Sequence, residues 1–393
     1  MKRVNMDHGA ATPLHPAVWE AMKPFFLEHF GNPSSGHSLG AGPRRAISEA
    51  RENVAALIGA TPEEVVFTSC ASEANNMAIK GIAAARGPQG NHIIASSIEH
   101  FSVLNPLKTL EKEGFRVTLL PVDRYGLVNP GDLASAITPG TILVSVMAAN
   151  PEIGTVEPLE DLAAVTRERG ILFHTDACAA AGRVPLDAGV GFDLLTLAGD
   201  QLRGPKGSGA LYVRRRTRLL PLLEGGIQER GIRAGTENVP AIVGLGKAAR
   251  LAAETMGERA RCLSGLRDEL RDGLFSRIPH LHLNGHPERR LPDNLHVSVE
   301  FVEGEALLLH LDMAGIRVSS GSSCTSQALK SSHVLGAVGL APELAQGSLL
   351  FTLGQDNTRE DIPYVVEELA RVANLLRQMS PLYHNYLKEH GKN

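Results

Sequence analysis

A run of small polar residues, Thr68-Ser69-Cys70-Ala71-Ser72, stands between a segment that is typical of a buried strand and a segment that is typical of a helix. The first N–H groups of a helix have no partner within the helix, and the helix dipole favours negative charge beside them. This motif could therefore bind an anion such as a phosphate group. The same residues could also form an ordinary helix cap, because serine is a good capping residue.

Three further polar motifs follow predicted strands: Ile98-Glu99-His100, Asn150-Pro151-Glu152-Ile153-Gly154 and His174-Thr175-Asp176. Ligands of parallel α/β sheets bind outside the carboxyl ends of the strands. Four side chains would meet at such an edge: Ser72, His100, Asn150 and Asp176. Each alone is more often structural, so their shared position is what predicts a site.

Cys324 lies among small polar residues, in a segment from Ser319 to Ser326 that is typical of an exposed loop. An accessible thiol becomes a nucleophile when its environment favours the thiolate. The alternative is an inert loop cysteine.

The elements that must position these residues alternate between helix and strand through the first two thirds of the chain. One helix is predicted to open at Ala41-Gly42-Pro43 and to end near Leu57, and another to start at Ser72. Short apolar strands are predicted over residues 64–68, 92–97, 141–147, 171–175 and 193–197. This pattern predicts an α/β fold with a mainly parallel, doubly wound sheet covered on both faces.

The pattern changes after about residue 255. An amphipathic helix is predicted over 256–275, and a half-buried antiparallel strand over 294–299, where polar and apolar residues alternate. A helix is predicted over 359–378. We therefore predict a large domain over 14–255 and a smaller α+β domain formed by 1–13 together with 256–393.

Composition excludes several other classes of protein. The 393 residues carry a formal net charge of -4, which gives no sign of a nucleic-acid surface. Only four cysteines occur, too few for a disulfide framework in a chain of this length. Neither a signal peptide nor an apolar run of the ~20 residues needed for a membrane span is visible. A soluble cytoplasmic protein is expected.

Several longer motifs resemble those of the NifS/IscS-type cysteine desulfurases, within the class V aminotransferases. They are Phe30 to Ser38 (FGNPSSGHS), Glu73 to Asn76 (EANN), Gly204 to Tyr212 (GPKGSGALY) and Arg233 to Thr236 (RAGT). The resemblance runs nearly end to end. It implies a fold-type I enzyme of the kind that uses pyridoxal phosphate (PLP).

The resemblance also implies roles for individual residues. Ala71 and Ser72 would hold the cofactor phosphate, His100 would stack on the pyridine ring, and Asn150 would lie near the substrate and the ring oxygen. Asp176 would pair with the ring nitrogen and so make the ring an electron sink.

Two further roles implied by the resemblance concern transfer between molecules. Thr236 would reach the phosphate in a partner subunit, which implies a homodimer. Cys324 would take sulfur from bound cysteine, carry it as a persulfide and deliver it to a sulfur acceptor or an iron–sulfur scaffold protein.

The sequence departs from the family pattern S-x-H-K-x-x-G-P-K-G at the residues that do the chemistry. Gln201 replaces the lysine that forms the Schiff base, Asp200 replaces the histidine and Ala198 the serine of this pattern. In two other family motifs, Ala179 replaces a glutamine and Gln355 replaces the arginine that binds the substrate carboxylate. An amide cannot form an imine. A positioned acid–base group typically increases a rate by ~10²–10⁴-fold. A charge-assisted hydrogen bond, such as one from an arginine at position 355, contributes about 1.5–3 kcal/mol to binding. The replacements predict that the lysine chemistry is lost.

Three functions remain open. The chain could act in sulfur mobilisation or iron–sulfur cluster assembly, with Cys324 as persulfide carrier or cluster ligand. It could instead hold PLP without a covalent bond through Ser72, Asp176 and Thr236.

The third possibility is a metal or iron–sulfur site in the degenerate pocket. Thiolate, imidazole and carboxylate groups are suitable ligands. Those predicted near the pocket are Cys70, Cys178, Cys324, Asp176, Asp200, His8 and His100. Against this, Cys70 and Cys178 could simply be small buried residues.

Overall fold

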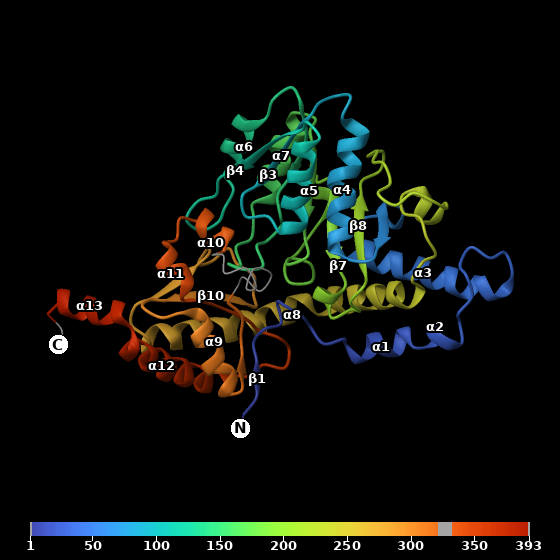
Figure 1. The fold of residues 1–393 in the computed structure, drawn as a ribbon. Coiled ribbons are helices and arrows are strands. Elements are labelled where there is room, and N and C mark those ends of the chain that lie inside the picture. The colour runs from blue at the N-terminus through green and yellow to red at the C-terminus, as the bar shows by residue number, and fades with distance from the viewer. Residues whose placement is uncertain (1, 321–331, 392–393) are drawn as a thin grey trace.

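The computed structural model describes residues 2–320 and 332–391. Its largest feature is a seven-stranded sheet (Figure 1). The strands lie in the order β2 (Val65–Thr68), β8 (Gly209–Val213), β7 (Leu194–Ala198), β6 (Leu172–Asp176), β5 (Thr141–Ser145), β3 (His92–Ser96) and β4 (Arg116–Leu120). Six of these strands run in the same direction, and β8 runs opposite to them. The predicted mainly parallel α/β fold is confirmed.

Helices cover both faces of this sheet. Successive residues of a strand point to opposite faces, so neighbouring residues pack in different cores. Ile93 packs in a core with α4 (Ala71–Arg86) and α5 (Phe101–Lys112), whereas its neighbour Ile94 packs in a second core. That second core also takes residues of α3 (Ser38–Leu57), α6 (Pro130–Ala136) and α7 (Leu159–Glu168). Burial on both faces explains why these strands read as continuous apolar runs.

A smaller antiparallel sheet has the order β12 (Ser348–Thr352), β10 (Asn294–Val299) and β9 (Leu281–Asn284). It packs with α9 (Gly304–Met313) and α12 (Asp361–Met379). The N-terminal strand β1 (Val4–Asn5) pairs in parallel with β11 (Ile316–Arg317), so the first residues lie beside this part of the chain.

The expectation of a half-buried strand at 294–299 is wrong, since all six residues of β10 are buried. Loops from the large sheet cover the polar face. The Asn294 side chain donates to the carbonyl oxygens of Pro151 and Glu152, and Asn284 donates to the Ser298 hydroxyl. The polar residues of the alternation are therefore hydrogen-bonded inside the molecule and not solvated.

Helix α8 (Val239–Arg277) joins the two parts (Figure 1). It begins 17 residues before the predicted start at 256, and a boundary between 255 and 256 falls inside it. Its first half, through Ala252, packs in the core beneath the large sheet. Its second half, from Leu263, packs against the small sheet. One continuous helix thus belongs to both cores.

The remaining helices are short. They are α1 (Pro16–Met22), α2 (Pro24–Leu27), α10 (His333–Ala337), α11 (Pro342–Gln346) and α13 (Pro381–Glu389). Among the described helices, none has the length and apolar character that crossing a membrane requires.

Candidate active site

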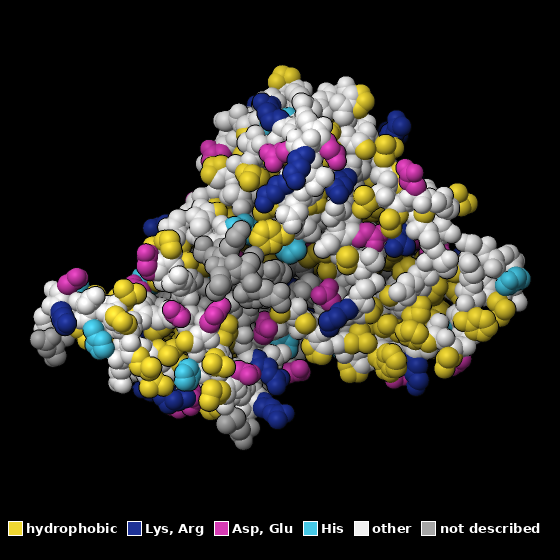
Figure 2. Space-filling view, viewed as in Figure 1, with side chains coloured by type: hydrophobic (Ala, Val, Ile, Leu, Met, Phe, Trp, Pro, Cys, Tyr) yellow, Lys and Arg dark blue, Asp and Glu magenta, His cyan; other side chains and the backbone are white. Residues whose placement is uncertain are grey.

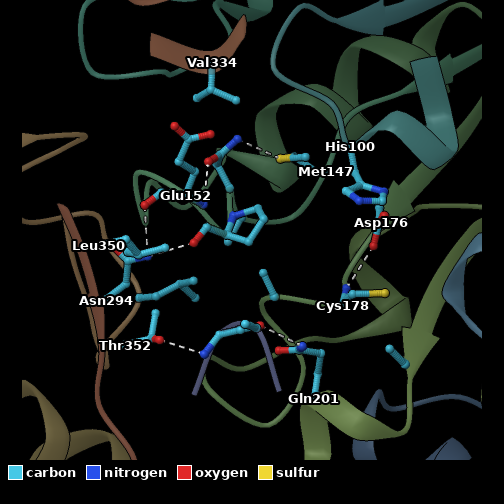
Figure 3. Close-up of a pocket in the computed structure, with 18 of the residues that line it drawn as sticks. His100, Met147, Glu152, Asp176, Cys178, Gln201, Asn294, Val334, Leu350 and Thr352 are labelled. Atoms are coloured by element: carbon cyan, nitrogen blue, oxygen red, sulfur yellow. Dashed lines mark hydrogen bonds between the residues drawn. The ribbon is translucent and has the colours of Figure 1, made fainter. Parts of the chain in front are cut away.

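A cavity of about 350 Å³ lies at the carboxyl ends of the parallel strands, facing β10 and β12 (Figure 3). Strand ends at the same edge bring together side chains that are far apart in the sequence. The structure places these predicted residues in the lining: Ala71, Ser72, His100, Asn150, Asp176, Cys178, Ala179, Ala198, Asp200 and Gln201. The convergence expected from the strand ends is therefore present.

Asp176, the last residue of β6, presents a buried carboxylate to this cavity. Its Oδ2 accepts a hydrogen bond from Asn75 Nδ2 at 2.7 Å, and its Oδ1 accepts one from the Cys178 backbone N–H at 3.0 Å. Two donors fix the orientation of the group. A fixed carboxylate in a cavity is suited to pairing with a protonated ring nitrogen.

His100 caps α5, and its ring is tied to Asp176 through two other side chains. Asn75 Nδ2 also donates to Ser102 Oγ at 2.8 Å, and Ser102 Oγ lies 2.7 Å from His100 Nδ1. The Ser102 backbone N–H donates to the same Nδ1. Because Nδ1 accepts, this network assigns the proton of the neutral ring to Nε2.

The N-terminus of α4 provides an anion cradle. The first backbone hydrogen bond of the helix runs from the Ala74 N–H to the Cys70 carbonyl oxygen. The N–H groups of Ala71 and Ser72 come before it and have no acceptor within the helix. The acidic residue of this turn is neutralised elsewhere, since Glu73 pairs with Arg233 at 2.8 Å. Burial raises the pKa of Glu73, but hydrogen bonds from Arg233 and Ser69 outweigh burial and lower it.

The side chain of Asn150 lines the cavity and also makes hydrogen bonds to the backbone of its own loop. Its Oδ1 accepts from the backbone N–H groups of Glu152 and Ile153 at 2.9 and 3.0 Å, and its Nδ2 donates to Ile98 O. The carbonyl oxygen is thus occupied. The amide nitrogen also donates to Met147 Sδ at 3.5 Å, a weak acceptor that a ring oxygen or substrate would have to displace.

Gln201 lies in a short turn after β7, and both ends of its amide are bonded. Figure 3 shows the bond at its amide nitrogen. Nε2 donates to Gly9 O at 3.1 Å, and Oε1 accepts from Arg183 Nη2 at 3.2 Å. Among the described residues, no lysine lines the cavity, and Lys206 is exposed outside it. Gln355 is also outside the large cavity; it lines a smaller one and contacts Arg203.

Two buried glutamates in the lining had no role assigned from the sequence. Burial raises the pKa of Glu99 to about 8 and that of Glu152 to about 7. Glu99 Oε1 accepts from Ser96 Oγ and from the Met147 N–H, while Glu99 Oε2 has no partner in the described part of the chain. Their position in the loops that follow the buried strands β3 and β5 was the only signal in the sequence.

Of the three cysteines predicted near the pocket, the structure describes two. Cys178 lines the cavity, and its pKa is raised by burial and then by Asp176. Cys70 is exposed at the N-cap of α4, Cys262 is exposed on α8, and Cys324 lies outside the described residues. Within residues 2–320 and 332–391, no group of three or more possible ligands is arranged around a metal position.

The residues of the cavity fit the phosphate and the ring nitrogen of a phosphorylated pyridine ring. The α4 N-terminus offers donors to a phosphate, and the anchored Asp176 carboxylate offers a partner for a ring nitrogen. The covalent attachment does not fit, because Gln201 is an amide. Thr236 is exposed and lies outside the lining of its own subunit's cavity.

Comparison with known proteins agrees with this geometry. The profile described as aminotransferase class-V matches residues 4–365. "Cysteine desulfurase IscS" of Dictyoglomus turgidum is 50% identical over 383 residues, covering 97% of each chain. "Cysteine desulfurase IscS 1" of Archaeoglobus fulgidus is 48% identical over 378 residues, covering 96% of this chain and 98% of the relative.

Solved structures show the same architecture. A "NIFS-LIKE PROTEIN" superposes with a TM-score of 0.90 at 35% identity, covering 95% of this chain and all of that one. A structure described as "SspA in complex with cysteine" superposes with a TM-score of 0.80 at 36% identity, covering 90% and 99%. With its sequence matched over most of its length and its fold shared with these proteins, the chain belongs to the aminotransferase class-V family.

Proposed function

We propose that this protein serves sulfur mobilisation as a desulfurase-like persulfide carrier. The observation that carries the proposal is Gln201, whose amide is bonded to Gly9 and Arg183 in a cavity whose described lining contains no lysine. Relatives named cysteine desulfurase support the connection with sulfur. Loss of the lysine removes release of sulfur from cysteine but leaves transfer of sulfur between thiols intact.

The transfer needs no oxidant. The Cys324 thiolate attacks the outer sulfur of a donor persulfide, a new S–S bond forms, and the donor leaves as a thiolate. The charge and the electron count are the same on both sides. A second exchange passes the sulfur to the thiol of an acceptor, which we propose to be a sulfur-acceptor or iron–sulfur scaffold protein.

Mass spectrometry tests the carrier function. After exposure to a small-molecule persulfide, the peptide that contains Cys324 should gain one sulfur atom, and a Cys324→Ser variant should gain none there. Cys178→Ala is the matched control, because that thiol is buried with a raised pKa. Labelling of Cys70 or Cys262 with Cys324 unchanged would overturn the proposal.

We further propose a homodimer. Large apolar side chains are exposed over α1 to α3, where Figure 2 shows a concentration of hydrophobic surface. They are Trp19, Phe26, Leu27, Phe30 and Leu39. Thr236 is likewise exposed, as a residue that completes a partner's site would be. Light scattering should give twice the 41.9 kDa chain mass.

A second candidate function is favoured by Asp176 and the α4 N-terminus, which support non-covalent binding of PLP or of its amino-acid adducts. PLP supplies an electron sink when it is bound. Ala71 and Ser72 would hold its phosphate, Asp176 its ring nitrogen, and His100 would present an N–H at Nε2. Retention of PLP absorbance through gel filtration, and its loss in Asp176→Ala, would support this function.

A metal or iron–sulfur site stays a third proposal, centred on Cys324. The described residues offer Cys178 and Asp176 in the lining but no complete ligand set. Metal analysis of protein purified without chelators is the direct test.

A further inference from the structure

Glu99, in the loop after β3, is a buried carboxyl group of the cavity wall that the functions proposed above do not use. Ser96 Oγ donates to Glu99 Oε1 at 2.6 Å, and the Met147 backbone N–H donates to the same oxygen at 2.8 Å. Oε2 has no partner among the described residues. Because both donors bond to one oxygen, the proton of a neutral carboxyl group belongs on Oε2.

The surroundings of Glu99 favour this neutral form. The charged groups that act on it are the carboxyl groups of Asp176, at the end of β6, and Glu157, in the loop after β5. The ring of His333 on α10 bonds to the backbone oxygen of Glu99 and not to its carboxyl group. A buried carboxylate without a cationic partner is costly, so the group keeps its proton. The pKa of Glu99, raised by burial to about 8, agrees with this assignment.

Two contacts connect Glu99 to the side chain of Asn150. Asn150 Nδ2 donates to the carbonyl oxygen of Ile98, the chain neighbour of Glu99, at 3.1 Å. The same nitrogen donates to Met147 Sδ at 3.5 Å (Figure 3). Met147 is the residue whose backbone N–H bonds to Glu99. Both acceptors of the Asn150 amide nitrogen therefore belong to residues that Glu99 holds in place.

The order of the strands indicates which part of a ligand Asn150 would meet. The α4 N-terminus follows β2 at one edge of the sheet, Asp176 ends β6, and Asn150 follows β5, the next strand away from β2. A pyridine ring with its phosphate at α4 and its nitrogen at Asp176 would turn its remaining edge towards β5. That edge carries the hydroxyl group of a phosphopyridoxyl ring.

We propose that Glu99 is a positioning residue for ring binding, because it holds Ile98 and Met147 where they turn the Asn150 amide towards the ring hydroxyl oxygen of a phosphopyridoxyl ligand. A thioether is a weak acceptor, so the ring oxygen can take the hydrogen that Met147 Sδ holds in the free protein. Without Glu99, the Met147 N–H loses its acceptor and the loop after β5 can shift. The inference deepens the second candidate function and rests on non-covalent binding of the ring.

Calorimetry on the full chain tests this role with two ligands that need no lysine. Pyridoxamine phosphate carries the ring hydroxyl, and its analogue with hydrogen in place of that hydroxyl does not. We expect the hydroxyl to tighten binding to the wild type by ~3–10-fold, the range of one hydrogen bond between neutral groups. Asn150→Ala should remove this preference. Glu99→Met, which fills the same space but accepts no hydrogen bond, should remove it as well.

Two further variants separate positioning from general damage to the cavity. Glu99→Gln should keep the preference, because a neutral amide can still accept from Ser96 and Met147 through its oxygen. Ser96→Ala is the matched control: it removes the other hydrogen bond of the same carboxyl group and should also keep the preference. A purely structural defect would weaken both ligands alike and leave the ratio of their affinities unchanged. If Glu99→Met does not fold, Glu99→Ala takes its place.

The outcomes distinguish this role from ring binding itself. Binding of neither ligand to the wild type overturns ring binding and this inference with it. Equal affinity of the wild type for both ligands overturns the hydroxyl contact and leaves ring binding standing. A preference that persists in Glu99→Met but is lost in Asn150→Ala overturns the role of Glu99. So does a loss in Glu99→Gln or Ser96→Ala that is as large as the loss in Glu99→Met.

Discussion

Gln201 is held by a backbone carbonyl at one end and by a guanidinium at the other, so its side chain is a structural link between the N-terminal segment and the cavity wall. The same wall holds Arg183 in place against Asp293. A residue that is merely a lost lysine would not need both contacts. We infer that the surroundings of position 201 are adapted to the amide.

Gln201→Lys should restore part of the lysine chemistry. The introduced amine would lie beside Arg183, whose positive charge disfavours a second cation and so favours the neutral amine that attacks an aldehyde. With PLP we expect a new visible band and, after borohydride reduction of the imine to a secondary amine, a stable label on that peptide. Desulfurase activity should remain low, because Gln355 and Ala179 are unchanged. The same label at any residue of the wild-type cavity would contradict this account.

The buried glutamates predict the pH dependence of stability. Glu99 and Glu157 have pKa values raised by burial to about 8, above the ordinary 4.5. The folded state then binds more protons than the unfolded state, so stability falls as pH rises toward 8. Buried His174, with its pKa lowered to about 4, opposes this only below about pH 6.5.

We therefore expect the melting temperature to fall between pH 6.5 and 8, and to fall less in Glu99→Gln, whose amide is neutral throughout. The measurement is thermal unfolding of both proteins in matched buffers. An equal slope in the two proteins would show that Glu99 is ionised in the folded state.

The strands that carry the site were predictable from the sequence where both of their faces are buried, because such a strand is a continuous run of apolar residues. Strands β3, β5, β6 and β7 were found within about two residues at their ends for this reason. Strand β8 was missed because Gly209-Ala210-Leu211-Tyr212 was interpreted only as part of a longer motif. The start of α8 was missed because small residues such as Gly244 and Gly246 break its apolar repeat.

Gly246 allows α8 to approach α3 closely, which gives a prediction at the level of the element. A Cβ at Gly246 would lie 2.4 Å from Ala50 Cα, a backbone atom that cannot move away alone. We expect Gly246→Ala to destabilise the protein by ~1–3 kcal/mol, as overpacking does. Gly265→Ala in the same helix meets nothing within 4 Å and should stabilise slightly, by up to ~1 kcal/mol. Equal changes in the free energy of unfolding for the two variants, measured with denaturant, would mean that α3 and α8 are not so close.

The contacts within the site could not be read from the sequence. Strand ends predicted that His100 and Asp176 would converge, but not that Asn75 and Ser102 would link them. Likewise, the loss of arginine at 355 was visible, whereas the arginines around the small cavity come from positions 183, 203 and 259. Such contacts depend on side chains from distant segments, which carry no common local pattern.

At the scale of the whole molecule, two cores share α8, and the cavity lies between the large sheet and β10 and β12. This architecture is that of the family. The central claim is that the fold has kept its sulfur-handling framework while Gln201 has removed release of sulfur from cysteine.

Alanine formation tests that claim most directly, because each sulfur released from L-cysteine by lysine-dependent chemistry leaves one alanine. Purified protein with added PLP, L-cysteine and a thiol reductant should form no alanine above a protein-free control, and Gln201→Lys should form at most a little. Catalytic production of alanine and sulfide by the wild-type protein, at many turnovers per chain, would contradict the account.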